Sequence, residues 1–207
     1  MSDPTTRPTL VVWTDPGCPW AWETSRWLRN LRDRGLFEIE WRIFSLEVNT
    51  AGLQVPFSEA ADRYGEALTA MALARREGGD PGLETYYVAL GAIVHDGAEP
   101  ISAEVTRQAA DAAGMSGLVD RAASDPTLVE EITREYQEAR DIDVFGVPSL
   151  RLGGARPIYG PIMPEAPTGA AALEWWEHIS WLIGRDDVYE LKRWPRGRRP
   201  GISFTSS

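Results

Sequence analysis

A short apolar run that stops at a turn, directly before a helix signal, most constrains the fold of this chain. The run Thr9–Trp13 is rich in residues that favour strands, and Asp15-Pro16-Gly17 follows it as a turn. Pro19 suits the first turn of a helix, because its missing N–H would have no intrahelical partner there. The sequence therefore predicts a buried strand that leads into a helix, with Cys18 at the junction.

Cys18 is the only cysteine among 207 residues. The N–H groups at a helix N-terminus favour a thiolate, so a thiol at this junction is expected to be acidic. Without a second cysteine it cannot form an intramolecular disulfide, and redox chemistry needs a reactant from outside the chain. The alternative is a buried structural thiol, since free cysteine is among the most buried residue types.

The next segments continue a β-α-β unit. One helical face after Cys18 carries Trp20, Trp27, Leu28 and Leu31, and Gly35 ends the helix. Apolar and charged residues then alternate from Phe37 to Ile43, which is typical of a strand. Such a unit normally pairs its strands in parallel through a right-handed crossover.

The rest of the chain adds a helical block and a second strand region. Residues from Phe57 to Arg140 are rich in Ala, Glu, Arg and Leu and predict four or five helices. A hairpin is expected from strands at 147–152 and 157–159, followed by a helix over 168–184 with the stripe Trp175, Ile179, Leu182 and Ile183.

This order, β-α-β, helices, β-β-α, predicts an α/β protein with the thioredoxin fold and a large all-helical insertion between its two halves. The expected organisation is residues 1–50 for the βαβ half, 51–143 for the helical insertion domain, and 144–207 for the ββα half plus a tail.

Two local signals carry a resemblance to a known family. Cys18-Pro19 stands at the first strand-to-helix junction, and Gly146-Val147-Pro148 precedes the later strand. The chain resembles the DsbA family of thioredoxin-fold oxidoreductases and, more narrowly, the mycothiol-dependent nitroreductase group. The resemblance implies that Pro148 is cis and faces Cys18, and that the backbone of Val147 binds a thiol. The alternative for Pro148 is an ordinary proline at the start of an edge strand.

The residues that carry the resemblance span almost the whole chain. They are Asp15-Pro16-Gly17-Cys18-Pro19-Trp20-Ala21-Trp22, Thr24-Ser25-Arg26-Trp27, Ser45-Leu46, Ile93-Val94-His95, Gly146-Val147-Pro148, Tyr159-Gly160-Pro161 and Tyr189-Glu190-Leu191-Lys192-Arg193.

Ala21 is a departure from the family pattern. Redox-active members carry Cys-Pro-x-Cys, whereas this chain has Cys18-Pro19-Trp20-Ala21. Ala21 cannot resolve a mixed disulfide, so dithiol exchange within the protein is excluded. Monothiol chemistry stays open: Cys18 forms a mixed disulfide with a small thiol, and a second small thiol releases it. The resemblance implies mycothiol rather than glutathione as the thiol, and nitro-aromatic or similar electrophilic compounds as substrates.

Further residues are candidates for the cleft around the thiol. Trp20 and Trp22 flank Cys18 and are expected to form an aromatic wall for a flat substrate, although Trp20 suits inward packing equally. The resemblance places His95 in the pocket, and it also implies that Asn49 and Tyr64 line the cleft. His95 alternatively satisfies a helix C-terminus, and Asn49 and Tyr64 alternatively belong to the surface.

Two other functions fit the same residues. Kappa-class glutathione transferases and 2-hydroxychromene-2-carboxylate isomerase carry one Ser or Cys at the helix start, which stabilises a bound cofactor thiolate without changing redox state. A non-catalytic binding protein with a degenerate site is the third possibility, and it predicts an ordinary thiol pKa near ~8.5.

Composition excludes several other classes. A net charge of -10 and a pI of about 4.8 argue against nucleic acid as a partner. The basic residues Lys192, Arg193, Arg196, Arg198 and Arg199 are interpreted as a solvated tail.

The sequence has no secretion signal, no membrane-spanning stretch and no metal-ligand spacing. With a single cysteine, this predicts a cytoplasmic, metal-free protein. The tryptophan-rich last helix suggests a homodimer.

Overall fold

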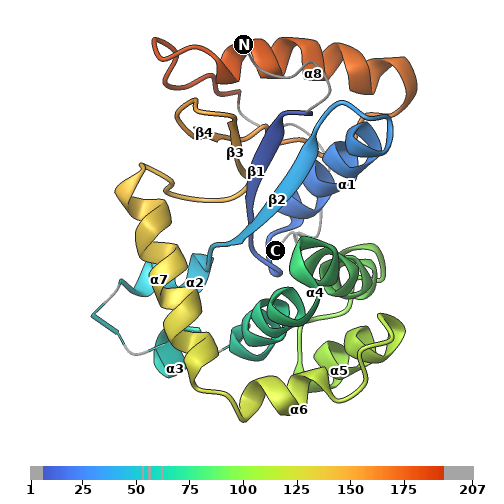
Figure 1. Ribbon diagram of the computed structural model, residues 1–207, viewed down its shortest axis with the longest axis vertical. Helices are drawn as coiled ribbons and strands as arrows, with labels where there is room; N and C mark the ends of the chain where they lie inside the picture. Colours follow the sequence, from blue (N-terminus) through green and yellow to red (C-terminus); the bar gives the residue numbers. More distant parts are fainter. Residues whose placement is uncertain (1–6, 53, 56, 62, 194–207) are drawn as a thin grey trace, which may run out of the picture.

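The fold is built on a four-stranded mixed sheet. The computed structural model describes residues 7–52, 54–55, 57–61 and 63–193. The sheet order is β2-β1-β3-β4, and Figure 1 shows it between α8 (Gly169–Ile183) and the helices of residues 57–141, with α1 (Pro19–Asp33) beside it. Its strands are β1 (Thr9–Thr14), β2 (Glu38–Ile43), β3 (Ser149–Leu152) and β4 (Ile158–Tyr159).

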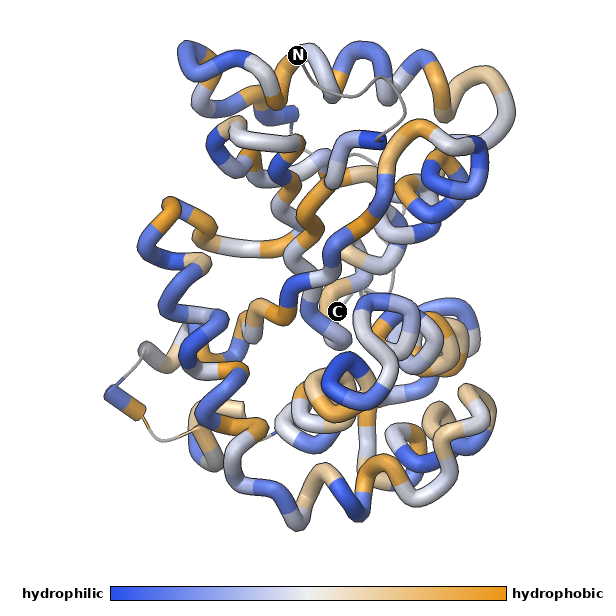
Figure 2. The backbone as a smooth tube through the Cα atoms, viewed as in Figure 1, coloured by the Kyte–Doolittle hydropathy of each residue, from blue (hydrophilic) through white to orange (hydrophobic). Residues whose placement is uncertain are grey.

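The N-terminal half forms the expected β-α-β unit. Strand β1 pairs in parallel with β2, and α1 (Pro19–Asp33) connects them. Trp27, Leu28 and Leu31 of α1 are fully buried, and the alternating residues from Phe37 to Ile43 turn their apolar side inward. Figure 2 shows hydrophobic residues along the central strands. Periodicity therefore predicted this half correctly.

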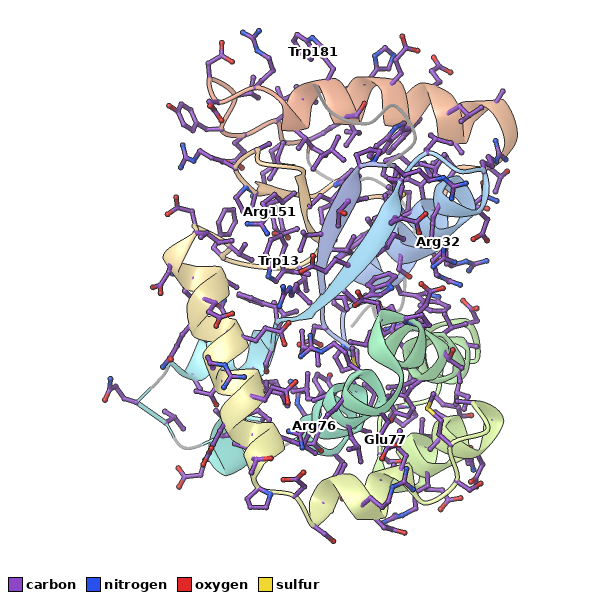
Figure 3. The ribbon with its side chains drawn as sticks, viewed as in Figure 1. Trp13, Arg32, Arg76, Glu77, Arg151 and Trp181 are labelled. Atoms are coloured by element: carbon purple, nitrogen blue, oxygen red, sulfur yellow. The ribbon has the colours of Figure 1, made fainter. Side chains whose placement is uncertain are left out.

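Strand β3 joins the second half of the chain to the first. It pairs antiparallel with β1, with Val12 opposite Leu150, and β4 pairs antiparallel with β3. The Arg151 guanidinium lies over the Trp13 ring of the neighbouring strand, 5.6 Å from the ring centroid (Figure 3). The thioredoxin-type order of the sequence prediction is confirmed.

Helices fill the chain between β2 and β3, and most of them gather on one side of the sheet in Figure 1. Gly79, with φ of +65°, divides the longest into two parts, because this backbone conformation favours glycine. The elements are α2 (Leu46–Ala51), α3 (Phe57–Ala60), α4 (Gly65–Gly91), a π-helical turn η1 (Ala92–Asp96), α5 (Ala103–Ala112), α6 (Leu118–Ala123) and α7 (Thr127–Asp141).

A buried ion pair fastens this helical region to the sheet. Both terminal nitrogens of Arg75 in α4 donate to the carboxylate of Glu135 in α7, each at 2.7 Å. The backbone N–H of Ile43 in β2 donates to the same carboxylate at 3.2 Å. One side chain therefore connects two helices and a strand.

The last helix, α8 (Gly169–Ile183), packs differently from the sequence prediction. Trp176, and not Trp175, contacts Phe37, with ring centroids 4.5 Å apart. Ala172 is fully buried, because a small side chain lets the helix approach the core closely. The predicted stripe is therefore right at Ile183 and wrong at Trp175, which is partly exposed. Apolar character alone could not choose between adjacent tryptophans.

No helix among the described residues is long and apolar enough to cross a membrane. Residues 1–6 and 194–207 lie outside the described residues. Arg196, Arg198 and Arg199 of the predicted tail are among them.

The Arg75–Glu135 pair predicts a large stability change. We expect Glu135→Gln to lower the free energy of unfolding by about 2 kcal/mol, because hydrogen bonds between charged groups are lost. Arg75 keeps Glu131 as a partner at 3.0 Å, so its charge stays compensated. The matched control is Arg134→Gln, since Arg134 pairs with exposed Glu138 at 3.9 Å and its replacement should change stability by under about 0.5 kcal/mol. Urea unfolding followed by circular dichroism measures both. Equal effects in the two variants would contradict the prediction.

Candidate active site

Cys18 lies at the junction that the sequence predicted. It is the N-cap residue of α1, its sulfur accepts a hydrogen bond from the N–H of Ala21 at 3.5 Å, and Pro19 is the first helical residue. The N–H of Cys18 donates to the carbonyl of Asp15 at 3.1 Å, which closes the preceding turn. The thiol therefore sits at the end of β1 and the start of α1.

The segment before β3 lies directly opposite the thiol. The Val147–Pro148 peptide bond is cis. The Cys18 thiol donates to the carbonyl of Val147, 129 positions away in the chain, with 3.7 Å between sulfur and oxygen. The fold thus brings together the two motifs that carried the family resemblance.

Burial controls the acidity of this thiol. Cys18 is only 4% exposed. Burial raises the pKa of its thiol from the usual 9.0 to about 11, and the hydrogen bond from Ala21 offsets only part of that effect. The expectation of an acidic thiol is therefore wrong for this structure, because loss of water outweighs the helix N-terminus. At neutral pH the thiol keeps its proton.

Asp15 clamps the cysteine turn to α2. One carboxylate oxygen accepts from the N–H of Gly17 and the other from the N–H of Leu46, both at 2.7 Å. Asp15 is fully buried, and burial raises the pKa of its carboxyl from the usual 3.8 to about 6. Sequence reasoning did not assign Asp15 to the site. The available signal was its place at the start of a turn, where Asp often accepts from the backbone two residues on.

Tyr64 packs against the same turn. A Cβ atom added to Gly17 would lie 2.4 Å from Cε2 of Tyr64, so only glycine lets the ring lie this close to the backbone. A pocket of about 440 Å³ opens here. Its lining residues are Gly17, Leu46, Glu47, Thr50, Ala51, Ala60, Arg63 and Tyr64.

His95 lies on η1 and contacts the cysteine turn. Its Nε2 is 2.9 Å from the carbonyl oxygen of Pro16. Because a carbonyl only accepts, Nε2 carries the hydrogen and Nδ1 is the acceptor of the ring. Burial lowers the pKa of His95, so the imidazole is neutral at pH 7. His95 therefore holds the turn through an uncharged hydrogen bond.

Trp22 belongs to the core behind the site and forms no exposed wall. Its side chain is buried, and its indole N–H donates to Asp96 at 2.9 Å. It stacks under His95, with centroids 6.0 Å apart. A Cβ on Gly91 would lie 2.3 Å from the Trp22 ring, which shows how tightly the ring is enclosed. Trp22 is therefore too buried to form an exposed wall, whereas Trp20 is only half-buried. The contact of either ring with a substrate stays a prediction.

Asn49 positions the segment before the cis peptide. Its amide N–H donates to the carbonyl of Phe145 at 3.3 Å, and its amide oxygen accepts from the hydroxyl of Tyr136 at 3.0 Å. Asn49 therefore ties α2 and α7 to the segment that leads to Val147. It is not among the residues that line the 440 Å³ pocket.

Two aromatic residues beside this segment received no role from the sequence. Phe145 and Tyr159 have ring centroids 5.1 Å apart, and both are exposed. Burial and the nearby Cys18 raise the pKa of the Tyr159 phenol. The signal for Tyr159 was its place in the Tyr159-Gly160-Pro161 motif.

Comparison with known proteins agrees with this geometry. Residues 17–193 match the model of the Rv2466c-like family, described as mycothiol-dependent nitroreductase Rv2466c. The chain belongs to this family. A relative from Mycobacterium tuberculosis (strain ATCC 25618 / H37Rv), described as uncharacterized protein Rv2286c, is 34% identical over 183 residues, which cover 86% of this chain and 79% of that protein.

Solved structures support the fold of this Rv2466c-like chain. A 2-hydroxychromene-2-carboxylate isomerase aligns with a TM-score of 0.60 at 14% identity, covering 84% of this chain and 94% of the isomerase. The disulfide oxidoreductase DsbA from Proteus mirabilis aligns with a TM-score of 0.53 at 15% identity, covering 87% and 88% of the two chains. Both likenesses show a shared DsbA-type thioredoxin fold.

Among the described side chains, His, Cys, Asp and Glu form no group of three or more that could hold a metal ion.

The raised pKa of Cys18 predicts slow alkylation at neutral pH. With iodoacetamide, the rate should rise about tenfold for each pH unit from about pH 8 to pH 10, without levelling off, because the thiolate is the reactive form. Mass spectrometry of quenched samples measures the rate. The same chain in urea is the control and should show a midpoint near ~8.5. A rate that levels off below about pH 10 in the folded protein would contradict the burial argument.

Asp15 predicts a pH-dependent loss of stability. Its pKa in the folded protein, about 6, is above the usual 3.8, so its protonated form favours folding. That contribution is complete below pH 3.8 and is lost as pH rises through about 6. The loss is about 3 kcal/mol, because each pKa unit corresponds to about 1.4 kcal/mol.

Asp15→Asn removes this titration and isolates its effect. Urea unfolding of both proteins at several values from about pH 4 to pH 7 gives the difference in their free energies of unfolding. The native protein should lose about 2–3 kcal/mol relative to the variant across that range. The other carboxyls are common to both proteins and cancel. A constant difference would contradict the raised pKa.

Proposed function

We propose that this chain reduces small electrophilic aromatic compounds, such as nitro-aromatics, with electrons from the small thiol mycothiol. The observation that carries the proposal is the contact between the Cys18 thiol and the Val147 carbonyl, in a member of the Rv2466c-like family. Because Ala21 supplies no second thiol, Cys18 is the one catalytic sulfur. The small thiol is consumed and is therefore a substrate.

The reaction balances with one protein thiol. In the first step, the Cys18 thiol and one small thiol form a mixed disulfide, and their two electrons and two protons convert a nitro group to a nitroso group and water. In the second step, another small thiol attacks the mixed disulfide, which releases Cys18 and a small-molecule disulfide. Each two-electron reduction consumes two small thiols.

The raised pKa of Cys18 is consistent with the first of these steps. The water that leaves carries away two protons, and a protonated Cys18 supplies one of them. Before the substrate binds, the Cys18 thiol donates this hydrogen to the Val147 carbonyl, with 3.7 Å between sulfur and oxygen. Cys18 therefore loses its proton during the reaction and does not rest as a thiolate.

The pocket beside Gly17 suits the polar body of mycothiol. Its volume of about 440 Å³ lies in the range of ~300–1,000 Å³ of small-molecule sites. Thr50 and Glu47 line it, and hydroxyl and carboxylate groups can form hydrogen bonds with the hydroxyls of a sugar. Glu47 already accepts from Arg63 at 3.0 Å. Arg63 also lines the pocket and balances the charge of Glu47, so the preference for mycothiol over glutathione rests on the family match.

Thiol consumption tests the proposal. With mycothiol and a nitro-aromatic compound, we expect two thiols to be lost for each two-electron reduction. Cys18→Ala should lower the rate at least about 100-fold, because it removes the nucleophile. Quenched samples should contain a mycothiol adduct on Cys18 by mass spectrometry. Thermal melting checks that the variant folds. Full activity in a folded Cys18→Ala protein would overturn the proposal.

A second function, thiol-dependent isomerase or transferase, is favoured by the protonated state of Cys18. A neutral thiol can donate a hydrogen bond to a bound thiolate and keep its redox state. Cys18→Ser separates the two functions, because serine also donates but forms no disulfide. An isomerase would keep activity in Cys18→Ser and consume no thiol. A non-catalytic binding protein would show neither reduction nor isomerisation.

We place the protein in the cytoplasm, because a small thiol is kept reduced there. We also propose that two copies of the chain associate through α8, since Leu173, Trp175 and Trp181 are exposed on that helix.

A further inference from the structure

Phe145 and Tyr159 form an exposed aromatic pair near the thiol that neither the core nor the proposed chemistry uses. Phe145 is 57% exposed and Tyr159 is 44% exposed. Their ring centroids are 5.1 Å apart and their planes are tilted by 32°. Exposed aromatic side chains that contact each other form an apolar surface that water solvates poorly.

Both rings lie beside the segment that binds the thiol. Phe145 precedes Gly146 and Val147 in the chain, and Val147 accepts from Cys18. A Cβ on Gly146 would lie 3.1 Å from Cε2 of Tyr159, so the Tyr159 ring covers the Gly146 backbone. Cys18 contributes to the raised pKa of the Tyr159 phenol, which agrees with a short separation.

The backbone that carries both rings is fixed from several directions. Asn49 donates to the Phe145 carbonyl at 3.3 Å. Tyr159 pairs with Ser149 in the sheet, and the N–H of Gly160 donates to the Pro148 carbonyl at 2.8 Å. The rings therefore project from rigid backbone, and a ligand that packs on them needs little reordering.

The size of the surface identifies the kind of ligand. Two aromatic side chains bury at most about 150–250 Å² each, whereas a stable protein interface needs about 800 Å² from each partner. A folded partner is therefore too large for this pair alone, and one small planar ring is of the right size. By contrast, the exposed Trp181 lies on α8 and points away from the sheet (Figure 3).

We propose that Phe145 and Tyr159 bind the aromatic ring of the electrophilic substrate next to Cys18 and so determine its specificity. The inference rests on the proposed function and adds the location of the substrate. The aromatic ring stacks on the apolar pair on one side of the thiol. The pocket beside Gly17 leaves room for the polar thiol.

The test compares two substrates with the same thiol. The aromatic substrate is 4-nitrobenzyl alcohol, and the non-aromatic one is bis(2-hydroxyethyl) disulfide. For Phe145→Ala we expect KM for the aromatic substrate to rise about tenfold with kcat within about twofold, because ring contacts bind ground state and transition state alike. KM for the aliphatic disulfide should stay unchanged. Phe145→Tyr should restore the aromatic KM, and Tyr159→Leu should raise it.

The control is Trp181→Ala, which removes an aromatic side chain that is 63% exposed on α8. It should leave both KM values unchanged. Direct binding of 4-nitrobenzyl alcohol to Cys18→Ala, by calorimetry, should weaken about tenfold when Phe145→Ala is added.

An active native protein whose aromatic KM and binding do not respond to Phe145→Ala would overturn this inference and leave the proposed function standing. A native protein that reduces neither substrate would overturn the proposed function. The calorimetric result would then still decide whether the pair binds an aromatic ring.

Discussion

The antiparallel pairing of β1 with β3 is the constraint on which the site depends. In an antiparallel pair, the end of one strand lies beside the beginning of the other. Trp13, near the end of β1, is paired with Ser149, at the beginning of β3. The turn that follows β1 carries Cys18, and the segment that precedes β3 carries Val147. Sheet register therefore creates the thiol–carbonyl contact across 129 positions of sequence.

The same closeness gives the thiol its character. A helix N-terminus stabilises a thiolate only as far as its N–H groups outweigh the loss of water. Here Ala21 donates across 3.5 Å, while the Val147 segment covers Cys18 from the other side. Burial prevails, and the pKa of the thiol rises. Burial of the thiol at this contact is thus the reason that it rests protonated.

Local pattern predicted much of the fold, because periodicity reports which side of an element is buried. It succeeded for Trp27, Leu28 and Leu31 and for the alternation of β2, where apolar and charged residues separate clearly. The pattern failed to predict which tryptophan of α8 faces the core. Trp175 and Trp176 are equally apolar, and only the approach of the helix to Phe37 decides between them.

The site was less predictable, because burial is a tertiary property. The sequence placed Cys18 and Val147-Pro148, but it could not show that Trp22 is enclosed by Gly91 while Trp20 stays half-buried. The role of Asp15 could not be predicted, because its two hydrogen-bond donors, Gly17 and Leu46, lie in separate segments. Relations of that kind exist only once the chain has folded.

The short helix α2 explains how the two sides of the site stay in register. Its first residue, Leu46, donates to Asp15 and so holds the turn of Cys18. Asn49 on the same helix holds the segment of Phe145, and Thr50 lines the pocket. One six-residue element therefore contacts the thiol turn, the aromatic side and the polar side together. A shift of α2 would move both proposed binding surfaces relative to Cys18 at once, because one rigid element holds the two backbone segments that carry them.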